Sequence, residues 1–197
     1  MKGTVCALLA ACAALAPRGA AAQLPLPVAL ELRGGLAFPL GDFREVGSDI
    51  GEGLGSGYTL GGSVTLELTP RVGAYVGYSY TRFDIEEFGT IDIVTDGVDA
   101  GVRVALPMAA VAAPWLRGGV VYHDADIVHD GPGTGPGQVG ATGRELGFEV
   151  GGGAEVRLGR RLSLTPGLSY VRFGTDSGFA GGAVTYLRGD VGLRFRP

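Results

Sequence analysis

The sequence predicts an all-β protein, a single antiparallel up-and-down transmembrane β-barrel of about eight strands. Residues 144–158 (RELGFEVGGGAEVRL) alternate in character from Glu145 onward. The even-numbered positions are apolar apart from one glycine, and the odd-numbered positions are charged residues and glycines. Successive side chains of a strand point to opposite faces, so one face would meet lipid and the other a polar interior. The run also exceeds the roughly 5 to 6 residues of an average soluble strand and suits a tilted membrane-spanning strand of about 9 to 11 residues.

Composition supports one β-domain. The chain has 197 residues, 37 of them glycine, and a formal net charge of −4. Glycine disfavours helices by about 1 kcal/mol relative to alanine, so this density argues against long helices and for curved strands. No basic patch with interleaved aromatic residues occurs, which argues against nucleic acid as a partner.

Residues 1–22 have the pattern of a secretory signal peptide, and residues 23–197 form the expected barrel domain. Lys2 is followed by an apolar run that is too short to span a bilayer as a helix, and three alanines precede Gln23. A rival reading is a lipoprotein signal in which Cys12 is acylated. Cleavage after Ala22 would remove both cysteines, which excludes thiolate chemistry, disulfides and cysteine-based zinc sites from the mature chain.

The expected strands share the same alternation as residues 144–158. In chain order they are residues 29–38, 58–68, 72–81, 94–106, 115–124, 144–158, 162–170 and 187–195. The first ends at a turn signal formed by Pro39, Gly41 and Asp42. Pro166 interrupts the seventh and suggests a bulge, because proline lacks the ladder donor.

Short and long connections are expected to alternate along the chain. The short ones are residues 69–71, 107–114 and 159–161, and the second of these is an apolar segment bounded by prolines. The long ones are rich in glycine and acidic residues and cover residues 47–57, 84–91, 125–143 and 174–182. This asymmetry is typical of membrane barrels with short periplasmic turns, which predicts that both termini lie in the periplasm.

Aromatic residues are expected to form two belts on the lipid-facing wall, one at each membrane interface. The belt near the long loops comprises Tyr58, Tyr78, Tyr80, Tyr122, Phe148, Tyr170, Phe173 and Tyr186. The opposite belt comprises Trp115 and Phe195.

From about residue 28 to 197 the chain resembles the small eight-stranded outer-membrane barrels, such as the outer-membrane protein X, opacity-protein and outer-membrane protein A families. Two stretches carry the resemblance: the Gly-x-x-x-Pro-x-Gly-Asp-Phe run at Gly35 to Phe43, and the closing segment Leu187 to Phe195. The resemblance implies Sec-type export to the bacterial outer membrane and recognition of Leu187 to Phe195 by the barrel-assembly machinery. Those families usually end on the aromatic residue, whereas Arg196 and Pro197 follow here.

The inward faces of the expected strands carry charge of both signs. The set comprises Glu67, Asp99, Arg103, Arg117, Glu145, Glu149, Glu155, Arg157, Arg188, Asp190 and Arg194. An eight-stranded interior is just wide enough for side chains to fill, and buried charges need partners. These residues are therefore interpreted as a salt-bridged plug with a structural role, and the alternative is a narrow passive pore or proton path.

Acidic residues dominate the expected loops: Asp42, Glu45, Asp49, Glu52, Asp84, Glu86, Glu87, Asp92, Asp124, Asp126, Asp130 and Asp176. They could bind divalent cations that bridge to lipopolysaccharide, or remain simply solvated. A cluster near the rim, His123, Asp124, Asp126, His129 and Asp130, could seed a metal site or a catalytic base. Neither histidine is followed by serine at the His-x-Ser spacing of lipid A deacylases. The overall expectation is a non-enzymatic outer-membrane protein with a structural or surface-interaction role and no metal or cofactor, and the enzymatic alternative is lipid modification.

Overall fold

The structure, a computed structural model, describes residues 27–45, 54–85, 91–107, 112–129, 137–141, 143–175 and 182–197. The strands are β1 (Val28–Pro39), β2 (Leu54–Glu67), β3 (Val72–Ile85), β4 (Ile91–Ala105), β5 (Ala112–His129), β6 (Gly137–Ala141), β7 (Glu145–Arg157), β8 (Leu162–Gly174) and β9 (Ala183–Phe195). A short 3-10 helix, η1 (Gly41–Phe43), follows β1. The predicted signal peptide lies outside the described residues, and within them no helix is long and apolar enough to cross a membrane.

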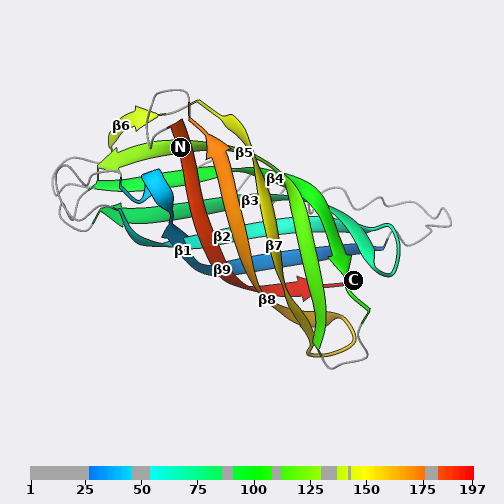
Figure 1. The fold of residues 1–197 in the computed structure, drawn as a ribbon. Helices are drawn as coiled ribbons and strands as arrows, with labels where there is room; N and C mark the ends of the chain where they lie inside the picture. Colours follow the sequence, from blue (N-terminus) through cyan, green and yellow to red (C-terminus); the bar gives the residue numbers. More distant parts are fainter. Residues whose placement is uncertain are drawn as a thin grey trace, which may run out of the picture.

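The sheet closes on itself as an antiparallel barrel (Figure 1). β1 to β5 pair in chain order, as do β7 to β9, and β1 pairs with β9 through a register that includes Leu30 opposite Phe195. β6 and β7 pair with successive parts of β5, so the nine segments occupy eight positions in the barrel. The predicted up-and-down barrel of about eight strands is confirmed.

The two faces of the wall differ as the alternation predicts. Large apolar side chains on the outer face are exposed, among them Leu32 at 70% and Leu146 at 69%. The side chains between them point inward and are buried, and they include many of the charged residues of the chain. Exposed hydrocarbon and buried charge are the reverse of a soluble barrel and suit a lipid-embedded wall.

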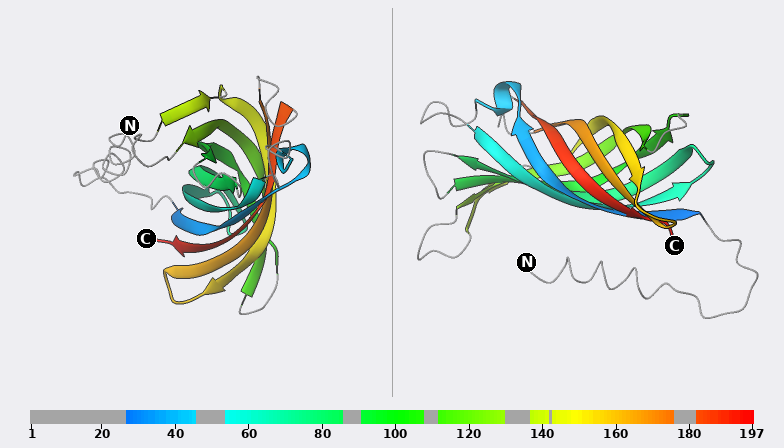
Figure 2. Two further views of the ribbon diagram at one scale, coloured as in Figure 1. Left: turned by 90° about the vertical axis from the view of Figure 1, so that its left-hand side faces the viewer. Right: turned by 90° about the horizontal axis from the view of Figure 1, so that it is seen from below.

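The two ends of the barrel are distinct. At the turn end, residues 68–71 join β2 to β3 and residues 158–161 join β7 to β8, each closed by a backbone hydrogen bond of 2.9 Å. The start of β1 and the C-terminus lie together at this same end (Figure 2). The opposite end, called the loop end, carries η1.

The strands extend farther toward the loop end than the sequence predicted. β3 continues to Ile85, and the expected loop at residues 125–143 contains the end of β5 and all of β6. The predicted turn at residues 107–114 was also too long, because β5 begins at Ala112. Pro114 lies in that strand, where its carbonyl accepts a 2.8 Å hydrogen bond from Leu106 N. Proline has no backbone N–H to donate to a neighbouring strand, and near the start of a strand this removes few of the hydrogen bonds of the sheet.

Candidate functional site

The lumen contains three layers of inward-pointing side chains. Nearest the turn end is the charged ring, formed by Glu31, Glu67, Arg103, Glu155, Arg194 and Arg196. The middle layer holds Arg33, Tyr75, Ser79, Asp99, Arg117, His123, Glu149, Arg188 and Asp190. Toward the loop end is the apolar cap, formed by Ala37, Phe43, Leu54, Phe83, Ile93, Val121, Ala125, Val171, Phe173, Val184 and Tyr186.

Arginine and glutamate alternate around the charged ring. Arg103 donates from Nη1 to Glu31 at 3.2 Å and from Nη2 to Glu155 at 3.1 Å. Arg194 reaches the same Glu31 Oε2 from the neighbouring strand at 3.3 Å. One carboxylate of β1 thus joins guanidinium groups from β4 and β9.

Arg196, just beyond β9, completes the ring. It donates from Nη1 to Glu155 Oε1 at 2.5 Å and from Nε to Glu67 Oε1 at 2.8 Å. Glu67 also accepts from Arg194 at 3.3 Å, which closes a cycle of three arginines and three glutamates. Partial burial lowers the pKa of Arg196, but its hydrogen bonds to Glu155 and Glu67 outweigh this effect and raise the pKa above its usual range.

Glu149 organises one half of the middle layer. Its Oε2 accepts from Arg188 Nη2 at 2.8 Å and from Arg117 Nη2 at 3.0 Å, while its Oε1 accepts from the Tyr75 hydroxyl at 2.6 Å. Arg188 Nε also lies 3.3 Å from Asp190 Oδ2, an ionic contact without hydrogen-bond alignment. Glu149 and Arg188 are completely buried, so their charges depend on these partners.

Asp99 organises the other half. Its Oδ2 accepts from Arg33 Nη2 at 2.9 Å, and its Oδ1 lies 2.7 Å from His123 Nε2. Ser79 Oγ contacts the same two atoms, at 3.3 Å from Asp99 Oδ1 and 3.4 Å from His123 Nε2. Serine and aspartate therefore share one imidazole nitrogen, whereas a serine nucleophile requires them on opposite nitrogens.

The ion pairs balance the lumen charge in each layer. The ring has three guanidinium groups and three carboxylates, and the middle layer has Arg33, Arg117 and Arg188 opposite Asp99, Glu149 and Asp190. Burying an unpaired charge costs several kcal/mol, roughly, in lost hydration. Because each layer holds equal numbers of positive and negative groups, ion pairing offsets this cost inside the narrow barrel.

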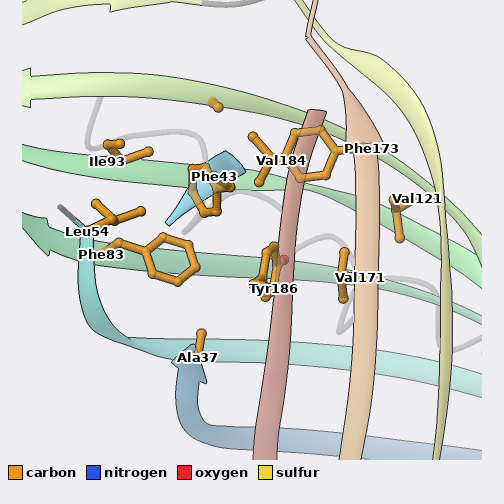
Figure 3. Packing of buried hydrophobic residues seen from close by; sticks show 11 residues of the cluster. Ala37, Phe43, Leu54, Phe83, Ile93, Val121, Val171, Phe173, Val184 and Tyr186 are labelled. Carbon is orange, nitrogen blue, oxygen red and sulfur yellow. The ribbon is translucent and has the colours of Figure 1, made fainter. Parts of the chain in front are cut away.

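The apolar cap was not predicted from the sequence, which indicated a polar interior throughout. Its centre is Phe43 from η1, fully buried and 5.2 Å from the Phe83 ring (Figure 3). Phe83 also packs against Tyr186 at 5.4 Å. Phe173 of the cap packs against His123 at 5.4 Å, which marks the border with the middle layer. Extending the alternation of the strands toward the loop end would have placed Phe83, Ile93 and Phe173 inside.

Comparison with known proteins agrees with the barrel architecture and the lipid-facing outer wall. A model of the outer membrane protein beta-barrel domain matches residues 4–195. The chain belongs to this family. Membership places the barrel in the bacterial outer membrane and accounts for its exposed hydrocarbon wall.

Three solved structures that are similar to this outer-membrane barrel are the following. Neisserial surface protein A has 13% identity, with 86% of this chain and 97% of that chain covered, and a TM-score of 0.64. OprG from Pseudomonas aeruginosa has 12% identity, coverage of 87% and 97%, and a TM-score of 0.46. Ail from Yersinia pestis has 13% identity, coverage of 86% and 97%, and a TM-score of 0.46. No curated protein matches the chain.

The barrel brings together most of the predicted interior residues, and two lie apart. Glu67, Asp99, Arg103, Arg117, Glu149, Glu155, Arg188, Asp190 and Arg194 all belong to the ring or the middle layer. Glu145 is half-buried near the start of β7, and Arg157 is exposed at the turn end. Glu31, Arg33 and Arg196 were missed. The alternation of Leu30, Leu32, Leu36 and Phe38 would have placed Glu31 and Arg33 inside.

Three predicted aromatic-belt residues are misplaced. Phe173 and Tyr186 lie inside the barrel as part of the apolar cap. Trp115 was expected on the lipid face, yet it is only 4% exposed and lies in the lumen beneath Arg103, whose Cζ is 4.6 Å from the centre of the indole. Its position in β5 has the same parity as inward Arg117, so the alternation itself predicts this placement. In β5, the position along the strand and not the aromatic character of Trp115 decides which face the side chain takes.

The other predicted aromatic-belt residues lie on the outer face. Tyr58, Tyr78, Tyr122, Phe148 and Phe195 are exposed, and Tyr80 and Tyr170 are half-buried beside them. Cross-strand ring pairs join Tyr58 to Tyr80 at 6.2 Å and Phe148 to Tyr170 at 6.0 Å.

The predicted loop acids are only partly described. Asp49, Glu52, Glu86, Glu87, Asp130 and Asp176 lie outside the described residues. Of those described, Asp124 accepts a hydrogen bond from Arg144 at 3.3 Å, and Asp92 accepts one from Arg82. Within the described part of the chain, no three histidine, cysteine, aspartate or glutamate residues are grouped so as to hold a metal ion.

Proposed function

We propose that this outer-membrane barrel is a closed structural and surface-interaction protein rather than a pore or an enzyme. The observation that carries the proposal is the filled lumen. The charged ring, a closed cycle of six charged side chains, fills it at the turn end, and the middle layer and the apolar cap fill it toward the loop end. A barrel of eight strands has little interior space beyond its side chains.

The cap argues against ion conduction. Phe43, Phe83, Phe173 and Tyr186 are each at most 1% exposed, and they come from η1, β3, β8 and β9. An ion crossing this layer would lose its hydration shell without gaining charged or polar ligands. The free-energy cost of that desolvation is roughly tens of kcal/mol in a purely apolar medium. The charged groups below the cap are engaged in ion pairs, so they supply no free conduction path.

The histidine geometry argues against lipid hydrolysis. His123 is 1% exposed and lies inside the barrel, where a membrane lipid on the outer wall does not meet it. Ser79 and Asp99 contact its same nitrogen, so no relay from acid through imidazole to nucleophile is formed. These features support a non-enzymatic protein.

We infer the partners of the barrel from the chemistry of its outer wall, its loop end and its last strand. The apolar wall contacts lipid and lipopolysaccharide, and the acidic residues toward the loop end, such as Asp84, Asp92 and Asp124, suit divalent cations shared with anionic headgroups. Residues Leu187 to Phe195 form most of β9, and Phe195 is 40% exposed on its outer face, which supports presentation of this segment to the barrel-assembly machinery.

Planar-bilayer recording tests the closed lumen. The purified, refolded barrel should give no steady single-channel conductance. The double substitution Arg103→Ala with Arg188→Ala removes bulk and pairing from both charged layers, and it should lower stability and raise leak current. Arg160→Ala at the exposed β7–β8 turn is the matched control. Stable, ion-selective steps from the unmodified protein would overturn the proposal in favour of a pore.

A further inference from the structure

The turn end of the barrel carries exposed arginine side chains, called here the arginine patch. Arg71 lies at the end of the β2–β3 turn, and Arg157, Arg160 and Arg161 surround the β7–β8 turn. Within the described part of the chain, none of them forms an ion pair, whereas the arginines of the lumen do. The patch is therefore positive charge without an internal partner.

No exposed acidic side chain at the described turn end offsets the arginine patch. The acids nearest to it, Glu31, Glu67 and Glu155, are members of the charged ring and pair with its arginines. The sequence that joins β4 to β5, residues 106–111, contains no acidic residue. The α-carboxylate of Pro197 cancels at most one positive charge. This end of the barrel is thus a cationic surface.

The arginine patch lies at the edge of the lipid-facing wall. The last outward side chains before the two turns are Leu68, Leu158 and Leu162, which are 59%, 56% and 39% exposed. Both turns are tight, since Leu68 N donates to Val72 O and Leu158 N donates to Leu162 O, each at 2.9 Å. The arginines are near neighbours of these leucines in the sequence, so their long side chains reach the headgroup level of the bilayer.

Headgroup phosphates suit this patch chemically. A guanidinium group is planar and donates two parallel hydrogen bonds to a phosphate. An anionic phospholipid presents its phosphate without the neighbouring ammonium group that phosphatidylcholine carries. Tight turns do not reach partners far beyond the membrane surface, so charge and depth together favour a lipid over a periplasmic protein or a cell-wall polymer.

We propose that Arg71, Arg157, Arg160 and Arg161 bind the phosphate groups of anionic phospholipids in the leaflet that meets the turn end. With both termini in the periplasm, as the sequence predicts, this is the inner leaflet of the outer membrane. The inference goes beyond the closed barrel and does not depend on it, because the patch lies outside the filled lumen. In a bilayer of phosphatidylcholine alone the patch lacks an anionic ligand, so Arg160→Ala leaves stability and conductance unchanged there.

Energy transfer from Trp115, the sole tryptophan of the chain, measures which lipids surround the barrel. The protein is refolded into phosphatidylcholine vesicles that contain a small fraction of pyrene-labelled lipid, either phosphatidylglycerol or phosphatidylcholine. At low salt, transfer to the labelled phosphatidylglycerol should be the larger, and the ratio gives a relative association constant. Arg160→Gln with Arg161→Gln should lower this constant by up to about fivefold per arginine.

The matched control is Arg44→Gln with Arg144→Gln, which removes the same charge from exposed positions at the loop end and should leave the constant nearly unchanged. Equal transfer to the two labelled lipids by the unmodified protein would overturn the proposal. The same constant for the turn-end and loop-end variants would overturn it too.

Gel mobility with and without heating first establishes that each variant is folded. If the turn-end variant does not fold, salt titration of the unmodified protein decides the matter. At about 1 M NaCl the Debye length falls to about 3 Å, so a preference that rests on the arginine patch should disappear. A preference for phosphatidylglycerol that persists in that salt would overturn the proposal.

Discussion

The indole of Trp115 fills the space that a side chain on Gly167 would need. A Cβ atom on Gly167 would lie 2.8 Å from both Cη2 and Cζ2 of the indole, and one on Gly153 would lie 2.7 Å from Cζ2. Facing glycines of β7 and β8 therefore form a notch for the ring, and this notch lets a tryptophan point into so narrow a lumen.

Gly167→Ala should destabilise the barrel by about 1 to 3 kcal/mol, the usual cost of overpacking a filled core. Gly118→Ala is the matched control, because a Cβ there meets its nearest atom only at 3.8 Å. Urea unfolding in lipid vesicles, followed by Trp115 emission, measures both. Equal stability of the two variants would contradict the notch.

Phe43→Ala should cost about 3 to 5 kcal/mol, because it removes a fully buried aromatic ring from the centre of the apolar cap. Phe38→Ala changes a ring that is 45% exposed on the outer wall and should cost much less. Thermal unfolding followed by gel mobility compares the two variants. A larger loss for Phe38→Ala would mean that the cap does not hold the loop end together.

Arg196→Ala should lower the unfolding free energy by about 1 to 2 kcal/mol, less than the about 3 to 5 kcal/mol typical of a fully buried pair. The side chain is 35% exposed, so solvent screens part of the effect. Arg196→Lys should retain part of the stability, and Arg160→Ala should retain all of it. Urea midpoints at equal salt provide the measurement, and an unchanged midpoint for Arg196→Ala would show that the ring does not need this member.

Val150→Arg should cost about 2 to 4 kcal/mol, because it places a charge on the lipid face near the middle of β7. Val150 is 51% exposed there. Glu45→Arg, just beyond η1 and exposed, should be nearly neutral. Unfolding in vesicles tests the pair, and equal sensitivity at both positions would contradict the assignment of the outer face.

The mature protein should begin at Gln23, because the small residues Ala20 to Ala22 precede it and match a signal-peptidase site. Intact mass of protein extracted from outer membranes measures the N-terminus. A mass that corresponds to an acylated N-terminal Cys12 would instead establish the lipoprotein alternative.

Strand alternation was sufficient to predict the barrel and much of its interior. It placed Asp99, Glu149 and Arg188 inside because neighbouring residues such as Val98 and Val150 are plainly apolar. It could not reveal which charges meet, since Arg103 and Glu155 are 52 positions apart and are brought together because β4 and β7 both pair with β5. The alternation could not predict the burial of Phe43 either, because this residue lies in η1, which folds back into the lumen and is not part of an alternating strand.

The charged ring has a consequence for the order of assembly. Arg194 and Arg196 both belong to the C-terminal end of the chain, whereas Glu31, Glu67, Arg103 and Glu155 precede them. Until the last strand docks against the first, three carboxylates share one guanidinium and repel one another across the unfinished lumen. A chain that lacks its final segment therefore resists closing, and arrival of the C-terminus converts that repulsion into attraction. The carboxylates of the ring are therefore neutralised only once the segment that carries Arg194 and Arg196 is in place.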